Sequence, residues 1–155
     1  MIRARATAAI SRSTADVFAF LDDFTKTPLW NRLCVSLRSP DDGQRGRGTR
    51  LEYRHRTMGR EHTMLGELAV YAPPEHLRLR FEDAVVAIDV DFRITPTSAT
   101  SSALEHSVEV VLKTVFARLA APLVRASLAR HVATETLEIG RLLVAAGGVD
   151  PRGAS

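Results

Sequence analysis

The chain has 155 residues, of which 45% are hydrophobic and 25% charged, as expected for one globular domain with a single core. Its formal net charge is only +3, and acidic residues are interspersed with the arginines, which argues against the clustered basic surface that nucleic-acid binding needs. The single cysteine, Cys34, excludes an internal disulfide, and the five histidines lack the spacing of zinc ligands, so we expect neither a metal site nor a cofactor.

The first elements predicted along the chain are one strand and two short helices. Apolar and polar residues alternate from 2 to 10, which indicates a strand. Ser13 can cap a helix that follows it, and Asp16 falls in the favourable first turn. A second helical piece is predicted around residues 28–32, where Pro28 suits a first turn.

Six more strands are predicted at 33–38, 49–58, 61–71, 76–81, 85–94 and 102–112. The clearest hairpin signal is a turn at Gly59–Arg60, which would place Tyr53 opposite Gly66. One face of that hairpin is mostly apolar and the other mostly charged, which supports the pairing over a one-residue slip. Residues 95–101 are expected to form a turn.

The final third of the chain predicts one long helix from about Lys113 to Ala146. Pro122 either kinks this helix or lies in the first turn of its main part. We expect one domain over residues 1–146 and a disordered tail over residues 147–155. A long helix after an antiparallel sheet can be embraced by that sheet. We therefore predict an α+β fold, a curved seven-stranded antiparallel sheet around the helix, with room between them for an apolar small molecule.

Several stretches, in this order, resemble the START-like (SRPBCC) superfamily with its helix-grip fold. They are residues 13–21, Trp30, Gly48, residues 71–77 and residues 119–123. Within that superfamily, the chain is most similar to the bacterial polyketide cyclase/dehydrase and lipid-transport family. The resemblance covers about residues 2–145 and implies a fold more firmly than a reaction.

This resemblance implies two functions, an enzyme that cyclises and dehydrates a polyketide by aldol chemistry, or a non-catalytic carrier or sensor of a lipid or similar ligand. A third hypothesis is a stress-response or partner-binding domain with a vestigial pocket. The implied partners are a hydrophobic, polyketide-like small molecule and an acyl carrier protein. No apolar run reaches the about 20 residues of a membrane-spanning helix. No signal peptide is evident, so we expect a cytoplasmic monomer or homodimer that contacts neither nucleic acid nor the membrane interior.

Inward-facing residues of the strands and helices are the candidate ligand contacts. We expect Trp30 to form a wall or lid of the cavity, because a large amphipathic ring suits that place. The full set of predicted contacts is Trp30, Asn31, Leu51, Met64, Leu68, Leu79, Phe81, Val90, Phe92, Val108, Leu123, Ser127 and Arg130.

Three polar residues on inward faces are the candidate acid/base groups, namely His106, His55 and Tyr53. His106 lies between apolar residues, and a histidine pKa near neutrality suits proton transfer. Tyr53 and His55 are two positions apart on one strand and therefore point the same way. The alternative is that all three are satisfied structural side chains.

Charged residues and the cysteine have simpler expected roles. We expect the Arg45 and Arg47 side chains to lie in a solvated loop, with attraction of an anionic ligand or an acidic carrier protein as the alternative. Glu135 is expected on the solvated side of the last helix. Cys34 is predicted to be a small buried side chain rather than a nucleophile.

Overall fold

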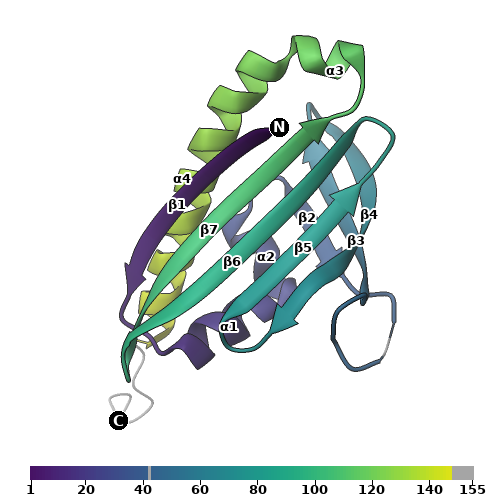
Figure 1. Cartoon of the computed structure of the whole chain (residues 1–155). Helices are drawn as coiled ribbons and strands as arrows, with labels where there is room; N and C mark the ends of the chain where they lie inside the picture. Colours follow the sequence, from purple (N-terminus) through teal and green to yellow (C-terminus); the bar gives the residue numbers. More distant parts are fainter. Residues whose placement is uncertain (42, 148–155) are drawn as a thin grey trace.

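The computed structural model describes residues 1–41 and 43–147. It contains one antiparallel sheet in the order β1-β7-β6-β5-β4-β3-β2, which confirms the predicted α+β fold. A long C-terminal helix lies against the curved sheet, and the short helical segments that follow β1 lie behind the sheet in this view (Figure 1). The strands are β1 (Ile2–Ile10), β2 (Cys34–Arg38), β3 (Arg50–Thr57), β4 (Arg60–Ala72), β5 (His76–Glu82), β6 (Val86–Ser98) and β7 (Ser101–Leu112).

The helical elements follow from local capping signals. Helix α1 (Thr14–Asp22) begins after Ser13, whose side chain accepts a hydrogen bond from the Asp16 amide at 3.2 Å. The short η1 (Phe24–Lys26) and α2 (Thr27–Trp30) come next. Two further helices, α3 (Val115–Leu119) and α4 (Ala121–Gly147), complete the chain.

Pro122 lies in the first turn of α4, so a short helix precedes the main one and there is no kink. Helix α4 continues through Gly147, where the predicted tail was expected to begin. Residues 148–155 of that predicted tail lie outside the described residues.

The face that α4 turns inward differs from the expected one. Its fully buried residues are Val132, Thr136, Ile139 and Leu143, spaced four, three and four positions apart along one face of the helix. Leu123 is 70% exposed, which corrects its predicted inward position. The helix packs mainly on β1, at one side of the sheet, and this choice of partner determines which side chains face inward.

The β3–β4 hairpin turns one residue earlier than predicted. Met58 and Gly59 form the turn, both with positive φ (53° and 77°), and Thr57 pairs with Arg60. Tyr53 consequently faces Met64, and Leu51 faces Gly66. The pairing moves by two residues, so side chains as far as Leu68 keep their predicted faces. The bulge between Leu68 and Val70 pairs Val70 with Arg78 and turns it away from its predicted inner face.

The β6–β7 hairpin is longer than predicted. Strand β6 continues to Ser98, through the segment expected to be a turn, and β7 begins at Ser101. Pro96 is tolerated there because β5 begins at His76, which pairs with Arg93, so Pro96 lies beyond the paired part of β5.

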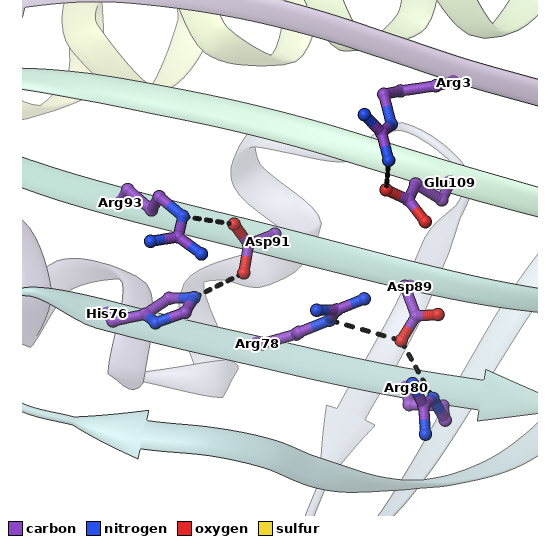
Figure 2. Close-up of polar contacts among 8 residues, drawn as sticks. All are labelled: Arg3, His76, Arg78, Arg80, Asp89, Asp91, Arg93 and Glu109. Carbon is purple, nitrogen blue, oxygen red and sulfur yellow. Dashed lines mark hydrogen bonds and ion pairs between the residues drawn. The ribbon is translucent and has the colours of Figure 1, made fainter.

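The outer face of the sheet carries a network of ion pairs, most of them between neighbouring strands (Figure 2). Asp91 contacts His76 at 2.5 Å and Arg93 at 3.2 Å, while Asp89 contacts Arg80 at 2.9 Å. Such pairs stabilise neighbouring strands modestly. The charged side chains lie on the outer face, and the apolar inner face packs against α4 and the short helices.

Candidate ligand cavity

A cavity of about 160 Å³ lies between the inner face of the sheet, α4 and the α1–α2 segment. Most of its wall is apolar. A dry cavity of about this size is large enough to take up one aromatic ring. The polar side chains on the wall are Thr27, Asn31, Tyr53, His131 and Glu135.

Half of the predicted site residues lie on this wall. The predicted residues that line the cavity are Trp30, Asn31, Tyr53, Leu79, Phe81, Val90, Phe92 and Val108. Residues from the helical segment and from β3, β5, β6 and β7 therefore meet around one space, although they are far apart in the sequence. Whether they contact a ligand stays a prediction.

The other predicted contacts lie away from the wall, for two reasons. Leu51, Met64 and Leu68 are at most 3% exposed and belong to the packed core. On α4, Ser127 is half-buried and Arg130 is exposed, because the helix turns its Val132 side inward. Leu128, Val132 and Glu135 take the places on the wall that had been expected for Leu123, Ser127 and Arg130.

Aromatic rings set the shape of the cavity. Trp30 and Phe92 meet edge to face, with centroids 5.8 Å apart and planes at 87°. Tyr53 and Phe81 lie 5.3 Å apart at 43°. Such arrangements stabilise ring pairs and restrict their rotation. The aromatic part of the wall is therefore held in a defined shape.

A hydrogen-bonded pair provides a polar point on this wall. The Asn31 Oδ1 atom accepts from the backbone amides of Leu33 (3.0 Å) and Cys34 (3.2 Å), which directs its Nδ2 atom to the Tyr53 oxygen at 3.3 Å. The phenol oxygen accepts this bond, so the phenol hydrogen can be donated to a ligand. Burial raises the pKa of Tyr53, and the phenol stays neutral at ordinary pH.

His106 lies behind the wall rather than on it. Its side chain is fully buried, and its ring stacks on Phe92 with centroids 4.5 Å apart. Trp30 meets the same ring edge-on at 6.2 Å. Burial lowers the pKa of His106 to about 4, so its imidazole is neutral at pH 7. Direct contact of His106 with a ligand would require Phe92 or Trp30 to move.

His55 is next to the cavity but outside its lining. Its ring stacks on Tyr53 with centroids 5.1 Å apart and lies 5.6 Å from the ring of His62. Its Nδ1 atom is 3.1 Å from the Thr57 hydroxyl. Desolvation, with a smaller effect of His62, lowers the pKa of His55. The three predicted acid/base residues therefore do not surround a single point.

Glu135 is the functional candidate that sequence reasoning missed. It was expected in solvent, but its side chain is only 14% exposed and lines the cavity. Burial raises its pKa from 4.5 to about 8. The signal was present in the spacing, because Glu135 belongs to the same helix face as Leu128, Val132 and Ile139.

The contacts of Arg45 and Cys34 indicate structural roles for both side chains. Arg45 donates to the Asp22 carboxylate at 2.7 Å and lies over the Phe24 ring at 4.1 Å, so the loop before β3 is attached to α1 and η1. This corrects the expected solvated position of Arg45. Cys34 is buried, and burial raises the pKa of its thiol to about 12, as expected for an unreactive side chain.

The outer face has a second hollow, lined by charged side chains of β1, β5, β6 and β7. Its acids are already paired: Asp91 with His76 and Arg93, Asp89 with Arg78 and Arg80, and Glu109 with Arg3 (Figure 2). Because these charges neutralise one another, we interpret the hollow as a structural network of ion pairs.

The residues that the structure describes contain no group of three or more His, Cys, Asp or Glu arranged to hold a metal, and no helix among them has the length and apolar character to span a membrane.

The curved sheet, the long helix and the apolar cavity between them make up a START-like, helix-grip fold. A family profile described as polyketide cyclase / dehydrase and lipid transport matches residues 1–138. The chain belongs to this family. No curated protein sequence matches the chain significantly.

Solved structures show the same fold at low sequence identity. TTHA0849 from Thermus thermophilus has a TM-score of 0.75 and 16% identity, over 94% of this chain and 99% of that one. The Zhui aromatase/cyclase from Streptomyces has a TM-score of 0.72 and 16% identity, over 95% and 98%. A START superfamily protein from Mycobacterium smegmatis has a TM-score of 0.59 and 18% identity, over 87% and 98%. At these identities the likeness establishes the fold, and the function has to be argued from the cavity.

Proposed function

We propose that this protein binds a compact hydrophobic or aromatic small molecule in the cavity between its sheet and α4. The observation that carries the proposal is the preformed space of about 160 Å³, lined by Trp30, Phe81, Phe92 and aliphatic side chains, with few polar groups. Pockets of this composition gain affinity from burial of apolar surface and gain orientation from a few polar atoms.

The specific activity that we propose is cyclisation and dehydration of a poly-β-ketone chain by aldol chemistry. The family description and the aromatase/cyclase fold relative support this class of reaction. The cavity holds about one ring, so it would enclose the segment that closes and bring its reacting carbons together. Tyr53 would donate a hydrogen bond to a substrate carbonyl, and His55 and His106 would act without direct contact with the substrate.

The second candidate is a carrier or sensor for a lipid or other hydrophobic ligand. The observation that favours it is the mostly apolar wall, on which the predicted acid/base residues do not converge. An acyl carrier protein partner belongs to the cyclase proposal alone. That partner, the cytoplasmic location and the choice between monomer and homodimer stay predictions.

Native mass spectrometry of freshly purified protein tests ligand binding even when the ligand is unidentified. A retained small molecule that is lost in Val108→Phe, which fills the cavity, and kept in Val111→Phe, on the outer face of the same strand, supports the proposal. Equal retention by both variants would place the ligand elsewhere. A cyclase further predicts that Tyr53→Phe changes the products formed from a short poly-β-ketone thioester, whereas a carrier gives no products with either protein.

A further inference from the structure

Two buried titratable side chains from facing elements meet at one side of the cavity. Glu135 of α4 lines the cavity, and His106 of β7 lies just behind the wall. The Glu135 Oε2 atom is 3.9 Å from the His106 Nε2 atom, too far for a hydrogen bond. Within the described part of the chain, this Nε2 atom is buried without a hydrogen-bond partner. The two groups are close and both retain hydrogen-bonding capacity.

A chain of hydrogen bonds fixes the tautomer of His106. The Thr136 hydroxyl donates to the Val132 carbonyl at 2.7 Å, so its hydrogen is committed. The Thr136 oxygen is 3.1 Å from the His106 Nδ1 atom and must therefore accept a hydrogen from it. A neutral imidazole with hydrogen on Nδ1 has a free lone pair on Nε2. That lone pair is on the nitrogen nearest to Glu135.

The surroundings favour a neutral pair over an ion pair. Two opposite charges this far apart attract each other too weakly to repay the removal of both ions from water. The residues described as lining the cavity include no lysine or arginine that would stabilise a carboxylate. The other titratable groups near Glu135 are Tyr53 of β3, Cys34 of β2 and His131 of α4. Burial raises the pKa of Glu135 to about 8 and lowers that of His106 to about 4, so both are neutral at pH 7.

We propose that Glu135 is the recognition acid of this cavity, whose carboxylic hydrogen is donated to the carbonyl oxygen of a neutral aromatic or alicyclic ketone. His106 is a positioning residue, because its Nε2 lone pair accepts the same hydrogen after a small movement of Glu135 when the cavity is empty. The inference rests on the proposed function and deepens it by naming the class of ligand.

A negatively charged ligand fits this site less well than a neutral ketone. A carboxylate ligand would be buried without a cation among the wall residues, which is strongly unfavourable. A ketone carries only acceptor atoms, which match the donor hydrogens of Glu135 and Tyr53. One ring with one carbonyl group also fits the volume of about 160 Å³.

The test compares two probes of nearly the same shape, acetophenone and ethylbenzene, of which only the first accepts a hydrogen bond. Their binding constants are measured by calorimetry at pH 6.5, and the acetophenone-to-ethylbenzene affinity ratio is compared between variants, so that general changes in the pocket cancel. We expect this ratio to fall about fivefold in Glu135→Leu and to be largely kept in Glu135→Gln, which retains a donor. The control is Glu138→Leu on the same helix, a carboxylate that pairs with Arg141 and lies outside the cavity lining, which should leave the ratio unchanged.

The outcomes separate this inference from the proposed function. Failure of the wild-type protein to bind either probe would overturn the proposed function and this inference with it. Binding of both probes with a ratio that Glu135→Leu leaves unchanged would overturn the role of Glu135 alone.

The positioning role of His106 is tested by nitrogen NMR of the imidazole in the wild-type protein at pH 7. The expected spectrum has a protonated Nδ1 and an unprotonated Nε2. In Thr136→Val, which removes the acceptor for Nδ1, we expect a shift toward the other tautomer. An imidazolium, or a hydrogen on Nε2, in the wild-type protein would overturn the assignment even if the variant does not fold.

Discussion

The side-chain amide of Asn31 donates to the phenol oxygen of Tyr53, 3.3 Å away, and joins α2 to β3 at the cavity wall. Both residues were predicted from the sequence as part of the site, but their mutual bond was not. A partly buried hydrogen bond of this kind has a net worth of about 1 kcal/mol, and a partner left unsatisfied costs more.

A double-mutant cycle measures this bond. We expect Tyr53→Phe and Asn31→Ala each to destabilise the protein, with a coupling free energy of about 1 kcal/mol in urea unfolding. Asn31→Ala should have the larger single effect, because Asn31 also accepts from two backbone amides. Strictly additive effects would show that the Asn31–Tyr53 bond contributes nothing to stability.

Gly66 is required by close packing between β4 and β5. A Cβ atom at this position would lie 2.2 Å from the Arg80 carbonyl oxygen and 2.5 Å from Phe81 Cδ1. We therefore expect Gly66→Ala to lower the free energy of unfolding by about 1–3 kcal/mol and to displace the Phe81 ring from the cavity wall. Gly43→Ala is the control, because a Cβ there has no atom within 4 Å. Equal stability of the two variants would contradict this account.

The buried carboxyl group of Glu135 should make the protein less stable as the pH rises. Its pKa is raised from 4.5 to about 8 in the folded protein, so the folded state holds the proton more tightly than the unfolded state. Its contribution is fully present below about pH 4.5 and is lost as the pH rises through 8. We expect the urea midpoint to fall between pH 6 and 8.5, and Glu135→Gln to flatten this fall. Glu138→Gln is the control and should follow the wild-type curve.

The buried imidazole of His106 should make the protein less stable as the pH falls. Its pKa is lowered from 6.5 to about 4, so the folded state binds the proton less tightly than the unfolded state. Its contribution is present above about pH 6.5 and is lost as the pH falls toward 4. His106→Leu should have a smaller loss of stability between pH 6.5 and 4.5 than the wild-type protein, whatever its stability at pH 7. A parallel loss in both proteins would mean that other groups cause it.

Arg45 should contribute to the attachment of the loop before β3. Its ion pair with Asp22 is about two-thirds buried, and its guanidinium also lies over Phe24. We expect Arg45→Ala to cost about 1 kcal/mol and to speed proteolysis of the loop. Arg47→Ala, which changes an exposed arginine of the same loop, should have little effect on either measurement. The account fails here if the two variants behave alike.

Strand and helix periodicities were enough to predict the fold. They located all seven strands, the Ser13 cap and the long final helix, because alternation and capping are local properties of the sequence. The hairpin register was missed by two residues, since Met58 was not expected to take a positive φ in the turn. The choice between a kink and a break at Pro122 depended on packing that the sequence does not display.

The site was predicted less completely than the fold. Residues on strand faces, such as Val90, Phe92 and Val108, were placed on the cavity side by alternation alone. The rotation of α4 was predicted wrongly, because exposed leucines such as Leu123 and Leu137 broaden the apolar stripe and obscure the narrower face that carries Glu135. Glu135 was therefore assigned to solvent, although it lies on the cavity wall.

The most direct test of the cavity uses Trp30, the single tryptophan of the chain, which lies on the wall. Its fluorescence is recorded while acetophenone is added to the wild-type protein, Val108→Phe and Val111→Phe. A saturable change in the wild-type protein and in Val111→Phe, and none in Val108→Phe, is the predicted result. A change that is linear in acetophenone, or that saturates equally in all three proteins, would contradict ligand binding between the sheet and α4.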